Sequence, residues 1–352
     1  MDTLPPIEGP VCPLPLTHNE QIVLGHGSGG RMSHDLITKT FLSAFDNPIL
    51  RTGDDAAPLE MDGAELAVST DSHVVTPLFF PGGDIGKLAV CGTVNDVAML
   101  GARPLYLTAG FILEEGLPIE TLQRVVASMK SAAEEAGVQI VAGDTKVVER
   151  GKADGLYITT TGVGLRRTGV RIGGAEARAG DAVILSGPIG DHGIAVLGAR
   201  GELGFQSGIQ SDVAPLNHLV EAMLDASPNV HVLRDPTRGG LATTLNEIAA
   251  QSNCCIILNE PDIPVGAAVT AACEMLGFDP LYVANEGKLV ALVAKEDSGR
   301  VLAAMQKTRY GEGAVIIGEV TDEPRNRVLL RTTLGTRRVL GMLAGEMLPR
   351  IC

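Results

Sequence analysis

Residues 84–113 read DIGKLAVCGTVNDVAMLGARPLYLTAGFIL, and this stretch decides the fold class. Asp84 follows a Pro-Gly-Gly turn and is typical of a helix N-cap, so the pattern predicts a helix over residues 84–100. The apolar segment PLYLTAGFIL that follows is typical of a strand. A helix that leads directly into an apolar strand indicates an α/β domain, in which helices pack on a sheet.

The segments on either side continue the same alternation. Upstream, residues 31–45 are predicted as an amphipathic helix and residues 65–70 as a strand. Downstream, a second helix begins at IETLQ and ends at Gly137, because glycine commonly terminates helices. The segments VQIVAGD (138–144) and LYITTTGVG (156–164) are predicted as further strands. This order predicts one α/β domain with helices on one side of a sheet.

A second alternation begins near Gly180, which predicts a second domain in a chain of 352 residues. The strands expected there are 181–187, 255–259, 288–294, 314–320 and 327–330, and the expected helices are 190–200, 215–226, 239–251, 265–276 and 296–306. We therefore expect a Pro-rich arm over 1–20, a first domain over 21–168, a second domain over 178–331 and a mobile tail over 335–352.

Charge and composition argue against several classes of protein. The formal net charge is −14, and nonspecific nucleic-acid binding requires clustered Lys and Arg instead. The sequence contains no uncharged apolar run of membrane-spanning length, and its first residues lack the pattern of a signal peptide. The six cysteines show no zinc-binding spacing. These features predict a cytoplasmic protein with reduced thiols, bound neither to membranes nor to nucleic acid.

Aspartates recur at the turn-like boundaries between predicted elements, where α/β proteins place ligand sites. They are Asp54, Asp55, Asp71, Asp96, Asp144 and Asp235. Any one of them is better explained as a turn or cap residue, because Asp favours both positions. As a set, their hard oxygen atoms favour Mg²⁺, which in turn binds phosphate oxygens. The set therefore predicts a nucleotide site.

Three further features fit a nucleotide enzyme but also have simpler explanations. The GHGSGG loop at 25–30 can surround phosphates with backbone N–H groups, although it is not a Walker A motif and a plain turn explains it too. Lys87 lies in the first turn of a predicted helix, where it suits a phosphate contact or a solvated charge. Lys146 and Glu286 are each explained as a solvated loop charge, and either could instead be a catalytic base or a charge clamp.

The sequence ends in MLPRIC, so its last residue is Cys352. A terminal residue is usually poorly ordered unless it docks, and an exposed free thiol is reactive. The segment from Gly335 to Cys352 spans at most about 55 Å when it is fully extended. That length predicts a reactive sulfur that can enter an internal cleft and also reach a partner.

Several motifs, taken together, resemble one protein family. They are GHGSGGR (25–31), STDSHVVTPLFFPGGDIGKLAVCGTVNDVAMLGARP (69–104), GFILEEGLP (110–118), GDTKVV (143–148), GDHG (190–193), RDPTRGG (234–240), ANEGKL (284–289) and PRIC (349–352). From about Gly25 to Cys352 the chain resembles the hydrogenase maturation factors of the HypE family, in the PurM-like ATP-binding superfamily. The resemblance implies a two-domain α/β (α+β) fold whose N-terminal sheets pair across a homodimer.

The resemblance also implies the chemistry. A carbamoyltransferase, HypF, loads the terminal thiol to give an S-carboxamide, which the enzyme dehydrates to a thiocyanate with ATP and Mg²⁺. The cyano group then passes to iron on a HypC–HypD complex, as a ligand for the [NiFe] hydrogenase centre. The implied catalytic residues are Cys352, Glu286 as the base that removes a proton from the carbamoyl nitrogen, and Lys146 as the orienting group.

The ligand sets are implied in the same way. The metal ligands are Asp71 and Asp96, with Asp55, Asp144 and Asp235. The ATP-binding residues are Gly29, Gly30, Asp71, Lys87, Asn95, Asp96, Asp144 and Thr145. Two alternatives stay open. One is another ATPase of the same fold, similar to selenophosphate synthetase or a small-molecule kinase, although the glycine loop lacks the cysteine common in the former. The other is a non-enzymatic accessory scaffold that uses Cys352 as a metal or redox contact.

Overall fold

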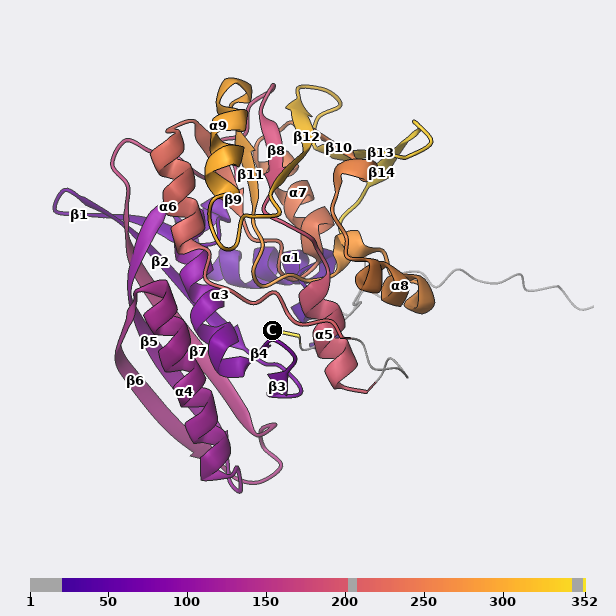
Figure 1. The fold of residues 1–352 in the computed structure, drawn as a ribbon. Helices are drawn as coiled ribbons and strands as arrows, with labels where there is room; N and C mark the ends of the chain where they lie inside the picture. Colours follow the sequence, from indigo (N-terminus) through magenta and orange to yellow (C-terminus); the bar gives the residue numbers. More distant parts are fainter. Residues whose placement is uncertain (1–20, 202–207, 344–350) are drawn as a thin grey trace, which may run out of the picture.

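Two β-sheets with their covering helices organise the chain, as the computed structural model in Figure 1 shows. The structure describes residues 21–201, 208–343 and 351–352. The first sheet has five strands in the order β1-β2-β7-β5-β6, and the second has seven in the order β14-β13-β10-β12-β8-β11-β9. The predicted arm over 1–20 lies outside the described residues, as does the part of the predicted tail at 344–350.

The first sheet contains every strand predicted before residue 168 and one that was not predicted. Its strands are β1 (Ala57–Met61), β2 (Ala64–His73), β5 (Ala102–Glu114), β6 (Gln139–Val148) and β7 (Leu156–Arg166), and β3 (Phe79–Phe80) and β4 (Gly83–Asp84) form a separate short ribbon. The unpredicted β1 forms a hairpin with β2 through Asp62 and Gly63, which both have positive φ angles. Asp-Gly is the typical sequence of such a turn, so the β1–β2 hairpin could be predicted from the sequence.

Two helices cover the first sheet, and both begin or end where the sequence indicates. In α3 (Ile85–Met99), the Asp84 carboxylate accepts hydrogen bonds from the backbone N–H groups of Gly86 and Lys87, which confirms the predicted N-cap. α4 (Ile119–Ala136) ends at Gly137 with φ of 71°, as predicted. α3 contacts the first sheet on one side and α6 and β9 of the second domain on the other (Figure 1). It is therefore buried along most of its length.

The predicted helix over 31–45 is helical but does not bury its apolar side chains. It consists of α1 (Arg31–Leu36), a π-helical turn η2 (Ile37–Leu42) and α2 (Ser43–Phe45), and it lies between the 3₁₀ turns η1 (Leu24–Gly27) and η3 (Leu50–Thr52). Ile37, Phe41 and Phe45 are all exposed. The amphipathic pattern thus identified the local helical structure, although these three apolar side chains are exposed in a single chain.

The second sheet is covered by helices on both faces. Its strands are β8 (Ala182–Leu185), β9 (Val230–Arg234), β10 (Cys255–Asn259), β11 (Val290–Val293), β12 (Val315–Thr321), β13 (Arg327–Arg331) and β14 (Arg337–Leu340). The helices are α5 (Asp191–Ala199), α6 (Asn217–Ala226), α7 (Gly240–Gln251), α8 (Ala267–Leu276) and α9 (Lys295–Met305), with 3₁₀ turns η4 (Glu260–Asp262) and η5 (Pro280–Tyr282). α7 packs on one face, and α6 and α9 pack on the other. Every residue of β8, β9 and β11 is therefore buried.

One hydrophobic cluster joins the two domains and also receives the end of the chain. It contains residues of α3 and α4 together with Val196, Val213 and Ala284 of the second domain. Ile351 is part of the same cluster and is 4% exposed. The end of the chain thus lies beside α3 and α5, where Figure 1 marks the C-terminus. Across the described ranges, no helix combines the length and the apolar character needed to cross a membrane.

Candidate active site

Four of the predicted aspartates converge in one group between the domains. Asp71 lies on β2, Asp96 lies on α3, Asp55 precedes β1 and Asp235 follows β9. Burial raises the pKa of Asp96 well above its usual range, and the charges of Asp235, Asp71 and Asp55 raise it further. Burial also raises the pKa of Asp235, and the negative charge of Asp55 raises it further. The structure therefore concentrates negative charge in a partly buried space, which favours a bound cation.

Protein groups bind two members of this acidic cluster (Asp55, Asp71, Asp96 and Asp235). Arg234 forms a short ion pair with Asp55, and its Nη2 donates to the carbonyl oxygen of Gly53 at 2.7 Å. The Ser69 hydroxyl lies 2.7 Å from Oδ2 of Asp96. These contacts hold the side chains of Asp55 and Asp96 in fixed orientations. The carboxylate oxygens of Asp55 and Asp96 that make no such contact are therefore also held in fixed positions.

Several buried polar atoms near the acidic cluster have no hydrogen-bond partner among the described residues. They include Oδ2 of Asp55, both ring nitrogens of His73 and Oε1 of Glu286. His73 is buried, and its Nε2 lies 3.6 Å from Oδ2 of Asp71. Buried polar groups are normally paired, so such a concentration of unpaired atoms is typical of a ligand site.

The tip of the chain docks beside this cluster. The backbone N–H of Val74 donates to the Cys352 oxygen at 3.0 Å, and Nε2 of His192 lies 2.7 Å from the carbonyl oxygen of Ile351. Val74 belongs to the first domain and His192 to the second. The final dipeptide therefore bridges the two domains and carries its sulfur into the space between them.

The electrostatic surroundings keep the docked thiol protonated. Burial raises the pKa of the Cys352 thiol far above its usual range, the charge of Arg238 opposes this, and Glu286 and Asp71 raise the pKa further. A hydrogen bond to the Glu286 side chain acts in the same upward direction. Burial likewise raises the pKa of Glu286, which is 4% exposed. The structure thus places a basic carboxyl group against the terminal sulfur.

The glycine loop contacts the same region, and its glycines have a packing role. A Cβ atom on Gly29, whose φ is +78°, would lie 2.7 Å from Cβ of Arg238. A Cβ atom on Gly30 would lie 2.4 Å from the carbonyl oxygen of Leu343, which accepts a hydrogen bond from the Arg31 N–H at 3.1 Å. The two glycines therefore allow the loop to pack against Arg238 and the start of the tail.

Asp144, Thr145 and Lys146 are not brought into the acidic cluster of their own chain. They lie on β6, the edge strand of the first sheet. Nζ of Lys146 lies 2.5 Å from Oδ2 of Asp144, and the two side chains are 69% and 71% exposed. This pairing lowers the pKa of Asp144. Within one chain these residues form a surface ion pair.

Lys87 and Asn95 lie on α3 but use their polar atoms in contacts within the protein. Nζ of Lys87 donates to the carbonyl oxygen of Gly82 at 3.4 Å. The buried Asn95 amide donates to the carbonyl oxygen of Ala214 at 3.1 Å and accepts from the N–H of Leu216 at 2.8 Å. Asn95 thus attaches α3 to the second domain.

Two residues that contact or face the chain end, His192 and Arg238, carry no role in the sequence-based prediction. Both stand inside quoted motifs, GDHG and RDPTRGG, and this is the sequence signal that marks them. Ile351, whose carbonyl oxygen contacts His192, is 159 residues away in the sequence. Local sequence pattern alone does not reveal a contact of that range.

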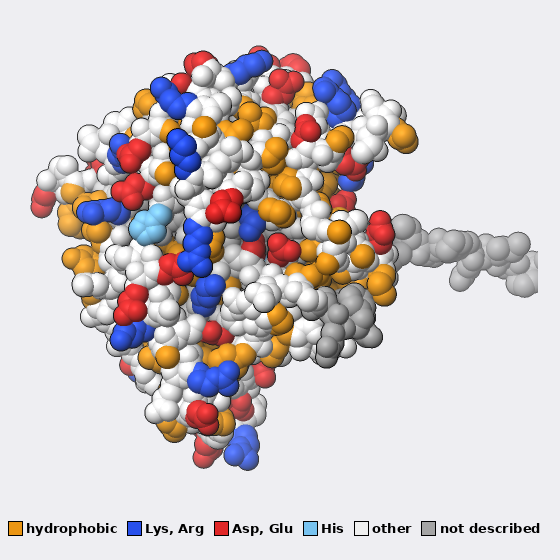
Figure 2. All heavy atoms as spheres, viewed as in Figure 1, with side chains coloured by type: hydrophobic (Ala, Val, Ile, Leu, Met, Phe, Trp, Pro, Cys, Tyr) orange, Lys and Arg blue, Asp and Glu red, His pale blue; other side chains and the backbone are white. Residues whose placement is uncertain are grey.

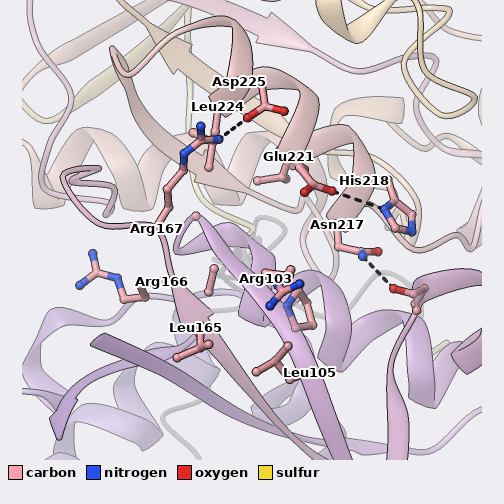
Figure 3. Close-up of a pocket in the computed structure, with 16 residues that line it drawn as sticks. Arg103, Leu105, Leu165, Arg166, Arg167, Asn217, His218, Glu221, Leu224 and Asp225 are labelled. Atoms are coloured by element: carbon pink, nitrogen blue, oxygen red, sulfur yellow. Dashed lines mark hydrogen bonds and ion pairs between the residues drawn. The ribbon is translucent and has the colours of Figure 1, made fainter. Parts of the chain in front are cut away.

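A separate cavity of about 610 Å³ lies between the start of β5, the end of α4 and α6 (Figure 3). In it, Nη1 of Arg167 binds Oδ1 of Asp225 at 2.6 Å, and Nδ2 of Asn217 donates to the Ala136 carbonyl oxygen at 2.9 Å. Its lining contains no member of the acidic cluster. On the face shown in Figure 2, acidic and basic side chains are interspersed.

Comparison with known proteins identifies the family. The model of the AIR synthase related protein N-terminal domain matches residues 53–166, and that of the C-terminal domain matches residues 178–331. A carbamoyl dehydratase HypE from Cupriavidus necator is 58% identical over 94% of this chain and 95% of its own length.

Solved structures agree with this relationship. A HypE–HypF complex contains a chain that matches with a TM-score of 0.84 and 50% identity, covering 88% of this chain and 99% of that one. A hydrogenase maturation protein HypE in complex with ATP matches with a TM-score of 0.80 and 53% identity, covering 94% and 100% respectively. The PurM-like two-domain fold expected from the sequence is thereby confirmed. The chain belongs to the HypE family of carbamoyl dehydratases, within the AIR synthase related proteins.

Proposed function

We propose that this protein catalyses the ATP-dependent dehydration of an S-carbamoyl group on Cys352 to a thiocyanate, the source of the cyanide ligand of the [NiFe] hydrogenase iron. The observation that carries the proposal is the docking of the terminal sulfur against Glu286, beside the acidic cluster. The relatives named carbamoyl dehydratase and the relative solved with ATP support the same activity.

The chemistry requires two proton removals and one phosphoryl transfer. The amide oxygen is a poor leaving group, and phosphorylation by ATP converts it to a good one. The carbamoyl nitrogen loses one proton as the oxygen is phosphorylated and its second proton as phosphate departs, which leaves a C≡N bond on sulfur. Glu286 is the base for this nitrogen, because its raised pKa makes its carboxylate a strong proton acceptor. The proposed orienting role of Lys146 requires two copies to pair, because Lys146 lies on edge strand β6, away from the acidic cluster of its own chain.

The residues present fit Mg²⁺ bound together with ATP. Mg²⁺ usually binds proteins through one or two carboxylates, with waters and substrate phosphates completing its shell. Within the described ranges, no group of three or more His, Cys, Asp or Glu side chains is arranged to hold a metal ion. Asp71, Asp96 and Asp235, with Asp55, would hold it, and it would neutralise charge on the transferred phosphoryl group. Gly29, Gly30 and Lys87 remain the proposed phosphate contacts.

Carbamoyl loading requires a different tail position from dehydration. The docked thiol is protonated and partly buried, so it is a poor nucleophile. We therefore propose that the tail is released when a HypF-type transferase loads it, docks for dehydration and is released again for transfer to a HypC–HypD iron complex. The solved HypE–HypF complex of a relative supports the first of these partners. All of these steps are assigned to the cytoplasm.

A second copy of this chain is the proposed partner for the exposed edge of the first sheet around β5 and β6. Exposed apolar side chains on β5 and β6 include Tyr106, Ile112, Ile140, Val141 and Val147. A mainly apolar groove of about 600 Å³ lies between α4 and β6. Asp144, Thr145 and Lys146 stand on the same strand. They take their proposed roles only if the pairing carries them to the acidic cluster of the other copy.

Replacing two apolar residues of β6 by aspartate tests this pairing. Val141 and Val147 are 56% and 68% exposed in a single chain. We expect a V141D/V147D double variant to sediment as a monomer and the unmodified protein as a dimer, because a homodimer interface excludes unpaired charge. Met275→Asp, at an exposed apolar position on α8, is the control and should remain dimeric. A dimer that withstands the double substitution would place the interface elsewhere.

Intact-mass analysis of Cys352 tests the activity itself. The protein is incubated with a carbamoyl donor, the partner transferase and Mg·ATP. We expect one carbamoyl group to be added and then one water to be lost, both only when Cys352 is present. A scaffold would show no ATP-dependent loss of water, and a small-molecule kinase would show no change at Cys352.

A further inference from the structure

Three contacts hold the last two residues in place. One of these contacts comes from the side chain of His192, which has no assigned role. The Ile351 side chain is buried in the cluster that joins the domains. The Cys352 oxygen accepts from Val74, and the Ile351 carbonyl oxygen lies 2.7 Å from Nε2 of His192. His192 is fully buried at the start of α5. Its contact is to the backbone of the tail, so it fixes the chain direction just before the reactive residue.

The hydrogen-bond network defines which nitrogen of His192 carries the proton. The Ser211 hydroxyl oxygen accepts from the N–H of Val213 at 3.1 Å and lies 2.8 Å from Nδ1 of His192. The hydroxyl hydrogen is therefore free to point to Nδ1, which acts as the acceptor. Nε2 then carries the hydrogen and donates it to Ile351. The ring of Phe80 lies edge-on to His192, with centroids 5.5 Å apart, and restricts the imidazole orientation further.

The same short segment that supports His192 also supports Glu286. Next to Ser211, the Asp212 carboxylate accepts from the backbone N–H of Glu286 at 3.0 Å. At the start of α5, the N–H of Gly193 donates to the carbonyl oxygen of Ala284 at 3.2 Å. His192 and Glu286 therefore belong to one hydrogen-bonded unit. A tail that binds His192 is placed at a fixed register relative to the Glu286 carboxyl group.

We infer that His192, oriented by Ser211, is a positioning residue for the dehydration step: by binding the Ile351 carbonyl it sets the Cys352 sulfur and its carbamoyl group against Glu286. The inference rests on the proposed function, which it deepens. His192 does not touch the reacting atoms. Its loss leaves a buried carbonyl oxygen without a donor in the docked state, so the equilibrium shifts toward the released tail.

Three substitutions separate this role from packing. His192→Leu keeps an apolar side chain of moderate size but removes the donor. His192→Gln places an amide N–H near the position of Nε2 and serves as the conservative rescue. Ser211→Ala removes the hydroxyl that fixes the tautomer. His231→Gln is the matched control, because His231 is also buried in the second domain but is paired with Asp181.

The first measurement is the alkylation rate of Cys352 by iodoacetamide, followed on the C-terminal peptide by mass spectrometry. It reports tail docking without needing any enzymatic turnover. We expect the rate to rise about tenfold for His192→Leu, to rise less for Ser211→Ala, and to stay within about twofold of the unmodified protein for His192→Gln and His231→Gln. Thermal unfolding of each variant reports whether the fold is retained.

The second measurement is single-turnover dehydration of pre-carbamoylated protein with Mg·ATP. We expect His192→Leu to slow this step about tenfold, with carbamoyl loading no slower than in the unmodified protein, and His192→Gln to restore the dehydration rate. Unchanged alkylation in a folded His192→Leu variant, or a His192→Gln variant as defective as His192→Leu, overturns the inference. If alkylation changes as expected but no protein loses water from the carbamoyl group, the positioning of the tail stands and the proposed function fails.

Discussion

Glu286→Gln leaves carbamoyl loading of Cys352 intact and slows its dehydration by at least about a hundredfold, which is the usual contribution of a positioned general base. Glutamine has nearly the same shape and can still bond to the sulfur, but it cannot accept a proton from the carbamoyl nitrogen. The glutamate is well suited to the task, because burial and the charges of Asp235, Asp71 and Asp212 raise its pKa. The measurement is single-turnover dehydration followed by intact mass.

The pH dependence of the same reaction is an independent test of Glu286 as the base. A base acts in its ionised form, so the dehydration rate of the unmodified protein should rise with pH through the raised pKa of Glu286 and then level off. The residual rate of Glu286→Gln should lack that rise. Glu319→Gln, the same change at an exposed position on β12, is the control and should keep the original profile. Full-rate dehydration by Glu286→Gln would remove this residue from the mechanism, and loss of loading as well would indicate a structural role.

Much of the local structure could be predicted because local rules govern it. The Asp84 cap and the Gly137 terminator define α3 and α4, and continuous apolar runs mark β8 and β10. β9 was missed because its sequence, VHVLR, alternates apolar residues with a histidine and an arginine that are buried only in the folded sheet. β14 was missed because three of its four residues are exposed and two are arginines.

The site was predictable where residues stand at element ends and not where distant segments meet. Asp55, Asp71, Asp96 and Asp235 come together because the turns and elements that carry them converge between the domains. Asp144 belongs to the same sequence pattern, but β6 is an edge strand and its residues face outward in a single chain. The place of Cys352 follows from an apolar residue before it and from backbone contacts to both domains, neither of which has a local sequence signal.

Removing one carboxylate of the acidic cluster should stabilise the protein without ligand and greatly reduce its stabilisation by Mg·ATP. In the folded state the pKa of Asp235 is raised well above that of an unfolded chain, about 3.9. A raised pKa means that the stability contribution of this group is present below about pH 4 and is lost as pH rises through the folded-state value. At pH 7.5, which is above the unfolded-state pKa, burial of this carboxyl group therefore opposes folding. We expect Asp235→Asn to increase the free energy of unfolding by on the order of 1–3 kcal/mol.

Asp235→Asn should increase stability without ligand, but it should decrease the additional stability that Mg·ATP provides. At a concentration of Mg·ATP one hundred times the Kd, binding stabilises the unmodified protein by about 2.7 kcal/mol, and a hundredfold weaker site retains only about 0.4 kcal/mol. Urea unfolding at pH 5 and pH 7.5, with and without Mg·ATP, measures both effects.

Asp297→Asn is the control with the opposite sign. Hydrogen bonds from Ser227 and Asn229 lower the pKa of Asp297, so its loss should destabilise the protein at pH 7.5 while the response to Mg·ATP persists. If Asp235→Asn instead lowers stability and keeps the full response, the four carboxylates form a structural network, and the metal and nucleotide bind elsewhere.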